Sequence, residues 1–136
     1  MPFDALEMSL AVMDQLAPME IKIRVRRKSL ADQVGRAAES VALNVSEARE
    51  RAGLDRTDLY RRAAGSASEL TTALRIARAR GYITQADYAA IDGVLDRVRA
   101  MLWGLCRARH NRHYAESWIM PSSGEFSTVR EGSDSA

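Results

Sequence analysis

Apolar and small residues recur in steps of three and four along residues 29–83, a spacing that keeps one face of an α-helix apolar. The pattern falls into two blocks separated by Gly53, which suits the left-handed conformation that closes helices. It predicts two long helices, over about 29–52 and 55–80, packed as an antiparallel hairpin. The recurring positions are Leu30, Val34, Ala37, Val41, Val45, Ala48 and Ala52, followed by Leu59, Ala63, Ser66, Leu70, Leu74 and Ala77.

Residues 4–17 form the first predicted helix, which Asp4 caps and Pro18 ends, because proline disfavours the helical conformation of the residue before it. Its predicted apolar seam consists of Phe3, Leu6, Leu10, Met13 and Leu16. Residues 19–28 alternate apolar and basic side chains as a strand does, but the chain offers them no partner strand. We expect an extended or irregular connection, or a further turn of helix, before a helix that Ser29 and Asp32 cap.

The last predicted helix starts at a capping pair, Thr84 and Asp87, and runs to about Arg109. Four helices with short connections predict an all-α fold, an antiparallel up-down four-helix bundle over residues 1–113. Residues 114–136 are predicted to be a mostly disordered acidic tail. Within the tail, Trp118, Ile119 and Met120 either dock on the bundle or on a neighbouring subunit, or have no role. The seam of the last helix is Tyr88, Ile91, Leu95, Val98, Leu102 and Leu105.

Composition and charge narrow the class of protein. The 136 residues carry a net charge of +2 and a single cysteine, Cys106, which has no partner for an intrachain disulfide. Because the tail has four acids against Arg130, its charge is −3, and residues 1–113 carry +5. No run of apolar residues is long enough for a membrane span, and no signal segment is recognisable. We therefore expect a cytoplasmic protein with no membrane partner.

Candidate catalytic chemistry is sparse, and we expect no enzyme. The two histidines, His110 and His113, lack the preceding glutamates of a di-iron bundle and lie at the end of the last helix, so no metal site is predicted. Cys106 is expected to be a small buried hydrophobe. Gly65 and Ser66 are expected to let two helices approach closely. No cofactor or small-molecule substrate is predicted.

The basic residues provide the main functional hypothesis, because clustered cations bind the phosphates of nucleic acid. The alternative is that acids such as Asp32, Glu39 and Asp58 neutralise these cations locally. The candidate nucleic-acid-binding residues are Lys22, Arg24, Arg26, Arg27, Lys28, Arg36, Arg61, Arg62, Arg75 and Arg78.

Four polar residues border the predicted seams of the second and third helices. A buried polar network that fixes helix register is the preferred interpretation, and a binding pocket is the alternative. These residues are Asn44, Glu47, Ser66 and Glu69.

Two segments resemble a known family. The segment QVGRAAESVALNVSEA at 33–48 and the segment AAGSASELTTALRIARARGYI at 63–83 are similar to motifs of the four-helix-bundle proteins found in intervening sequences of bacterial large-subunit ribosomal RNA genes. The sequence departs from the motif at Ala42, where the family has proline, and at Ala48, where it has glycine. The matching residues are Gln33, Arg36, Ala37, Ala38, Ser40, Asn44 and Glu47, then Ala64, Gly65, Ser66, Glu69, Leu70, Leu74, Ile76, Ala77, Gly81, Tyr82 and Ile83.

The resemblance implies properties that the residues alone do not give. The family's fold is similar to that of the accessory variability protein of diversity-generating retroelements, a basic pentameric barrel that binds a reverse transcriptase and nucleic acid. The resemblance therefore implies a ring-shaped homo-oligomer, a homopentamer, without catalytic activity. We therefore expect an oligomeric, non-catalytic protein that binds RNA or DNA, as accessory to a reverse transcriptase. The alternative is a protein–protein interaction scaffold without a nucleic-acid role.

Overall fold

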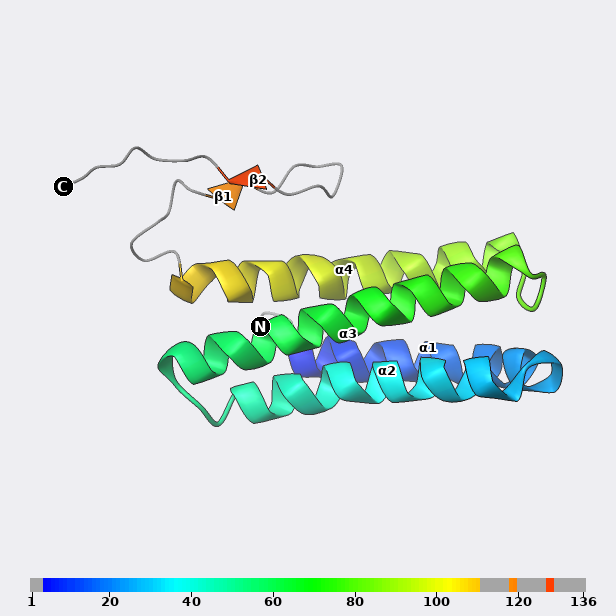
Figure 1. Cartoon of the computed structure of the whole chain (residues 1–136), viewed down its shortest axis with the longest axis horizontal. Coiled ribbons are helices and arrows are strands. Elements are labelled where there is room, and N and C mark those ends of the chain that lie inside the picture. The colour runs from blue at the N-terminus through cyan, green and yellow to red at the C-terminus, as the bar shows by residue number, and fades with distance from the viewer. Residues whose placement is uncertain (1–3, 111–117, 120–126, 129–136) are drawn as a thin grey trace.

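Four α-helices make up the body of the protein in a computed structural model, which describes residues 4–110, 118–119 and 127–128 (Figure 1). The helices are α1 (Ala5–Arg26), α2 (Lys28–Ala48), α3 (Gly53–Ala79) and α4 (Gln85–His110). Each helix packs on the next in the chain, and α1 also packs on α4, which closes the bundle. The predicted all-α fold with up-down connectivity is therefore confirmed.

Two short strands follow the bundle in the chain. β1 (Trp118–Ile119) pairs with β2 (Ser127–Thr128) in antiparallel fashion, with Trp118 opposite Thr128. Most of the predicted disordered tail, together with Phe3, His113 and Met120, lies outside the described residues. No helix of the described part of the chain is both long and apolar enough to cross a bilayer.

The core follows the predicted seams of α2, α3 and α4. Side chains of all four helices meet there, including Leu16, Val34, Leu74 and Leu95, none of which is more than 1% exposed. Cys106 is buried at the edge of this core, as predicted, and burial raises the pKa of its thiol. A thiol held in its neutral form is a poor nucleophile, so Cys106 packs as an apolar side chain.

Pro18 does not end the first helix, contrary to the prediction. α1 continues through it to Arg26, and the predicted connection over residues 19–28 is helical except at Arg27. A proline inside a helix costs about 3 kcal/mol, whereas burying a large apolar side chain stabilises by about 1.5–3 kcal/mol. Met19 and Ile23 both enter the core after Pro18, and their burial offsets the cost.

The seam predicted for α1 is only partly correct: Leu16, Leu6 and Met13 contact the core, and Leu10 does not. Leu16 is buried, but Leu6 and Met13 are only half-buried and Leu10 is 42% exposed. The buried side of α1 instead carries Met8, Val12, Leu16, Met19 and Ile23. Because α1 has apolar residues on two sides, their spacing alone does not show which side faces the bundle.

Helix ends follow the predicted chemistry at most positions. The Leu6 N–H donates to Asp4 Oδ1 at 2.8 Å, which confirms the first cap. Thr84 and Asp87 each accept a hydrogen bond from the other's backbone N–H, at 3.0 and 3.1 Å. Gly53 and Gly81 have φ of 65° and 80°, the conformation that glycine adopts without strain.

The junction between α1 and α2 differs from the prediction. α2 begins at Lys28 without a side-chain cap, so Ser29 does not cap it. The single residue Arg27, in extended conformation, separates the two helices. The Arg27 N–H still bonds to the Ile23 carbonyl, which ends α1 in a tight reversal. At its other end α2 stops at Ala48 rather than at 52.

Gly65 lies on the exposed side of α3, and a Cβ added there would meet no atom within 4 Å. Within this chain it does not mediate a close helix approach, contrary to the prediction. Gly65→Ala is expected to stabilise the protein by about 0.5–1 kcal/mol, because glycine is a poor residue for a helix interior. Gly81→Ala should destabilise it, because its φ is positive. Urea unfolding of both variants measures the difference, and a destabilised Gly65→Ala protein would contradict the expectation.

Candidate nucleic-acid interface

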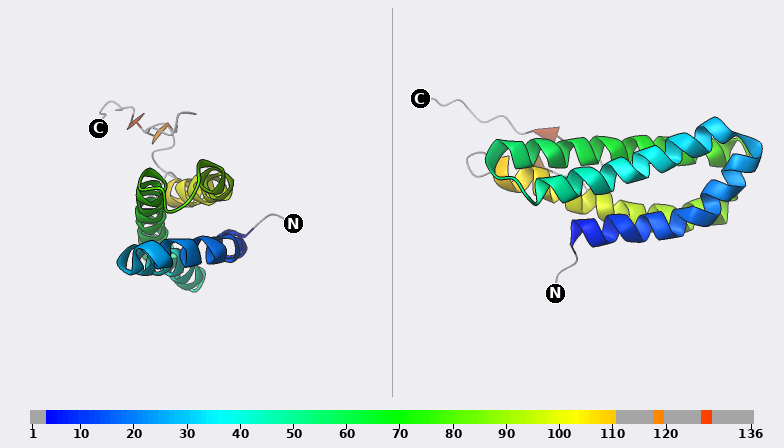
Figure 2. Two further views of the ribbon diagram at one scale, coloured as in Figure 1. Left: turned by 90° about the vertical axis from the view of Figure 1, so that its right-hand side faces the viewer. Right: turned by 90° about the horizontal axis from the view of Figure 1, so that it is seen from below.

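One end of the bundle brings together the α1–α2 junction and the turn between α3 and α4 (Figure 2). An up-down bundle requires this, because every second connection lies at the same end. We call this surface the basic end. Its cations, all exposed, are Lys22, Arg24, Arg26, Arg27, Lys28, Arg78 and Arg80.

Two acids neutralise part of the basic end. The Lys22 ammonium lies 2.9 Å from Asp87, and Asp32 binds both Arg24, at 2.8 Å, and Lys28, at 3.2 Å. Hydrogen bonds from Arg24 and Lys28 lower the pKa of Asp32, and the hydrogen bond from Lys22 lowers the pKa of Asp87. The proposed local neutralisation by Asp32 is therefore confirmed for Arg24 and Lys28, and Asp87 neutralises Lys22, although two acids do not balance seven cations.

Four arginines of the basic end form no ion pair with any acid in the described part of the chain. They are Arg26, Arg27, Arg78 and Arg80. Two of them lie over tyrosine rings: the Arg26 guanidinium is 5.2 Å from the centroid of Tyr82, and that of Arg78 is 5.7 Å from the centroid of Tyr88. Such contacts position a cation without neutralising it, so its N–H donors remain available to phosphate.

Arg80 and the two tyrosines were not predicted as site residues. The sequence did contain a signal that could have identified Arg80. Gly81 marks the turn after α3, and in an up-down bundle that turn lies at the same end as the α1–α2 junction. Residues flanking Gly81 therefore belong to the same end as residues 22–28.

The other predicted basic residues lie elsewhere. Arg75 is one turn before Arg78 on α3, and Arg36 lies in a groove between α2 and α3. Arg62 pairs with Asp58 at 3.1 Å, and Arg61 lies close enough to Cys106 to favour its thiolate. Since Arg61 is 17 residues from Arg78 on one helix, about 25 Å separates them along its axis. The ten predicted residues therefore do not share one surface.

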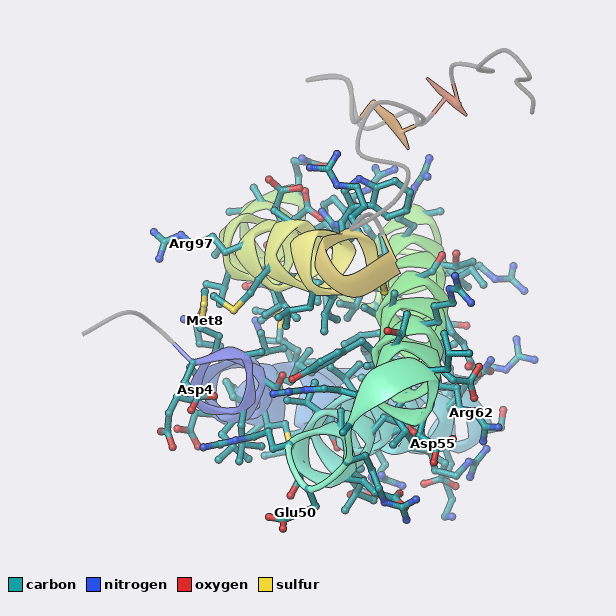
Figure 3. The ribbon with its side chains drawn as sticks, turned by 90° about the vertical axis from the view of Figure 1, so that its left-hand side faces the viewer. Asp4, Met8, Glu50, Asp55, Arg62 and Arg97 are labelled. Carbon is teal, nitrogen blue, oxygen red and sulfur yellow. The ribbon has the colours of Figure 1, made fainter. Side chains whose placement is uncertain are left out.

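The opposite end of the bundle has mixed charge. Figure 3 shows it, with Asp4, Glu50, Asp55 and Arg62 around its edge. Ion pairs there join Arg49 to Asp4 at 3.1 Å and Arg51 to Glu47 at 2.8 Å. Among the side chains that the structure describes, the two ends thus differ in electrostatic character, and the end with the α1–α2 junction has the clear excess of cations.

The predicted polar network exists in smaller form. The Ser40 and Ser66 hydroxyls are 2.7 Å apart and join α2 to α3, while the Asn44 amide donates to the Ser40 carbonyl at 2.8 Å. Glu47 and Glu69 are exposed, and Glu47 pairs with Arg51 instead. Ser40 was not predicted as a member of the network, yet it is the residue that connects Ser66 to Asn44.

Ser66→Ala is expected to destabilise the protein by about 1 kcal/mol, because it removes the inter-helix hydrogen bond and leaves Ser40 with only its contact to Asn44. Thermal unfolding of this variant measures the loss. Ser68→Ala, an exposed serine on the same helix, is the matched control and should have little effect. Equal stability of Ser66→Ala and the wild type would exclude a stabilising role for the network.

Glu20 of α1 is a half-buried carboxylate beside α2, with its Oε1 atom 3.3 Å from where a Cβ on Gly35 would lie. Burial raises its pKa, Arg24 opposes this shift, and Glu39 adds to it. A raised pKa in the folded state means that protonation stabilises the fold. This contribution is complete below the unfolded pKa of about 4.3 and is lost as pH rises through the folded pKa.

Glu20→Gln is therefore expected to raise the melting temperature at neutral pH, with the difference from wild type shrinking towards about pH 4. Glutamine is neutral at every pH and does not carry the cost of a buried charge. Melting curves across this range measure the effect, with exposed Glu50→Gln as the control. A lower melting temperature at neutral pH would show that the Arg24 attraction outweighs burial.

The described residues contain no group of three or more His, Cys, Asp or Glu side chains placed to hold a metal ion.

The groove between α2 and α3 is open and is lined by Arg36, Glu39, Ser40, Leu43, Asn44 and Glu69. The arrangement of the basic end is suited to binding an extended anion through several phosphates at once.

Comparisons with known proteins address the fold and the family. The model of the family described as 23S rRNA-intervening sequence protein matches residues 5–104. The structure is similar to a crystal structure, at 1.70 Å resolution, of a protein of unknown function from the S23 ribosomal protein family of Bacteroides thetaiotaomicron. The TM-score is 0.70 at 19% sequence identity, covering 76% of this chain and 98% of that one. No curated protein sequence matches the chain.

Proposed function

The chain belongs to the 23S rRNA-intervening sequence protein family, and on the strength of its basic end we propose that it binds nucleic acid without catalysing a reaction. The ligand is the sugar–phosphate backbone of RNA or DNA, and the contact surface is the end of the bundle where α1 meets α2. The other ends of α1 and α2 take no part in this contact.

The charge imbalance of the basic end is the observation that carries the proposal. Of the seven exposed cations there, three form ion pairs with two acids, Asp32 and Asp87, and four arginines form no ion pair within the described residues. Arginine N–H groups bind phosphate oxygens in a bidentate manner. Several separate arginines together favour an extended polyanion over a single small anion. Contacts of this kind tolerate many sequences.

The proposed assembly is a ring-shaped homo-oligomer, a homopentamer. Each subunit contributes one basic end, and several such ends on one rim contact a long nucleic acid at once. A modest affinity per subunit then becomes strong overall binding.

Binding of a structured RNA and of a DNA duplex, measured at about 50 mM and about 200 mM salt, tests the proposal. If one basic end neutralises about four phosphates, its affinity should fall by roughly 100-fold between the two conditions, and the fall should be steeper when several ends of a ring bind the same nucleic acid. Absence of binding, or binding that does not weaken with salt, would contradict it.

A protein–protein scaffold is the second candidate. It is favoured by the pairing of Lys22, Arg24 and Lys28 with acids and by the exposure of large apolar residues such as Val25, which is 79% exposed. A scaffold of this kind would show no affinity for RNA or DNA in the salt experiment.

A further inference from the structure

We propose that the basic end binds unpaired nucleotides in preference to a duplex, by stacking their bases on two arginine–tyrosine layers. This binding mode rests on the proposed function and specifies the class of nucleic acid that the surface takes. In the first layer the Arg26 guanidinium lies 5.2 Å from the ring centroid of Tyr82, and in the second the Arg78 guanidinium lies 5.7 Å from that of Tyr88.

Each layer joins two elements of the fold, so the bundle holds both layers in place. Arg26 is the last residue of α1, whereas Tyr82 lies in the turn between α3 and α4. Arg78 lies in the last turn of α3, and Tyr88 is the fourth residue of α4. Both layers therefore lie where α4 begins, at the end of the bundle that carries the excess of cations.

The tyrosine rings are the inner part of each layer. Tyr82 and Tyr88 are half-buried and pack against the core. Backbone hydrogen bonds fix both residues, from the Tyr82 N–H to the Ala77 carbonyl at 2.8 Å and from the Tyr88 N–H to the Thr84 carbonyl at 3.0 Å. Each arginine therefore lies on a ring that belongs to the packed body of the protein.

The arginines are the outer part of each layer. Arg26 and Arg78 are exposed and form no ion pair within the described residues. A guanidinium is flat, so one that lies on a ring keeps its N–H donors at its edge for phosphate, and the face turned away from the ring can take another flat group. Unpaired bases are such groups, and they stack on arginine planes as well as on aromatic rings.

The shape of the basic end favours a single strand over a duplex. Proteins read duplex DNA by placing a helix or a strand in the major groove. The four helices reach the basic end by their ends, and the connections there are the single residue Arg27 and the turn at Gly81 (Figure 2). Bases inside a duplex are stacked on one another, so neither layer can reach their faces. A flexible single strand presents both its phosphates and its bases.

Contact with phosphates alone predicts the opposite preference. A duplex has the higher charge density, and each phosphate contact releases about 0.9 counterion from B-DNA but only about 0.7 from a single strand. A basic end that touched only phosphates would therefore bind a duplex at least as tightly as a single strand. Tighter binding of the single strand is the mark of contact with bases.

Three labelled ligands, measured by fluorescence anisotropy with the full chain near 0.1 M salt, test the inference. They are an RNA strand without self-complementarity, the duplex of that strand, and a strand of equal length whose sugars carry no bases. The RNA strand should bind most tightly, by about 10-fold over the strand without bases, which cannot stack on either layer. Equal affinity for these two strands, or tighter binding of the duplex, would overturn the inference.

Arg26→Lys with Arg78→Lys removes the flat guanidinium from both layers and keeps both charges. Affinity for the RNA strand should fall about 10-fold, while the salt dependence stays the same because the number of cations is unchanged. Circular dichroism checks that the variant is folded.

Arg27→Lys with Arg80→Lys is the matched control. It makes the same exchange at two exposed arginines of the basic end that contact no aromatic ring in the described part of the chain. We expect a change of less than about threefold, since only phosphate contacts are altered. An equal loss in the two variants would assign the effect to phosphate contacts and overturn the stacking.

The same measurements separate this inference from the proposed function. A protein that binds none of the three ligands contradicts both. A protein that binds all three with strong salt dependence, and binds the strand without bases as tightly as the RNA strand, supports the proposed function and overturns only the contact with bases.

Discussion

Replacing Arg27 and Arg80 together by glutamine is expected to weaken the binding of structured RNA by about 10- to 100-fold near 0.1 M salt. Both arginines are exposed, lie at the basic end, and form no ion pair within the described residues. Each lost phosphate contact should also reduce the slope of log affinity against log salt by about one, so the double variant should lose about two for each basic end that contacts the RNA. Fluorescence anisotropy across a salt series measures both quantities.

Arg56→Gln with Arg97→Gln is the charge-matched control. Neither arginine forms an ion pair in the described part of the chain, and both lie away from the basic end; Figure 3 shows Arg97 pointing outward from α4. The control lowers the net charge by the same two units. If it weakens binding as much as the Arg27 and Arg80 variant does, then overall charge rather than the basic end determines affinity.

Leu70→Ala is expected to destabilise the protein by about 3–5 kcal/mol, the largest stability effect of any substitution considered. Leu70 is 1% exposed and adjoins a small internal void of about 10 Å³. Truncation enlarges that void at the centre of the bundle, where all four helices contribute its lining: Ser9, Val12, Ala38, Val41, Leu70, Leu95 and Val98. Chemical denaturation followed by circular dichroism measures the loss.

Leu54→Ala makes the same chemical change at an 80% exposed position and should alter stability by less than about 0.5 kcal/mol. A similar small effect for Leu70→Ala would mean that the helices do not close around a common core. The bundle itself would then be in doubt.

The sequence predicted α2, α3 and α4 well because each has a single apolar side. Val34 and Val45, Leu70 and Leu74, and Ile91 through Leu102 all reach the core as their spacing indicated. Gly81 and the Thr84–Asp87 pair marked ends that the structure confirms, whereas Gly53 is the first residue of α3 and does not close α2, which ends at Ala48. In these segments the local helix signals and the packing of the bundle favour the same structure.

The first helix was mispredicted because two of its features are ambiguous in the sequence. Pro18 signals a helix end locally, but the packing of Met19 and Ile23 overrides that signal. The apolar residues on two sides of α1 fit a buried seam equally well on either side. Only contact with α2 and α4 decides which side is covered.

The basic end depends on three-dimensional proximity that the sequence expresses only indirectly. Residues 22–28 and 78–80 are some 50 positions apart, and the pairing of Lys22 with Asp87 shows how close they lie in the fold. Which acids neutralise the cations was predicted only in part: Asp32 binds two cations and Asp58 binds Arg62, as expected, whereas Glu39 forms no ion pair in the described residues.

Hydrogen–deuterium exchange with and without a structured RNA tests the central claim most directly. The proposed function predicts that RNA protects backbone amides at the α1–α2 junction, around residues 26–30, and at the turn around residues 79–84. Amides of the α2–α3 connection, around residues 49–54, should exchange at the same rate in both states. Protection confined to that connection, or absent from the basic end while RNA is bound, would contradict the claim.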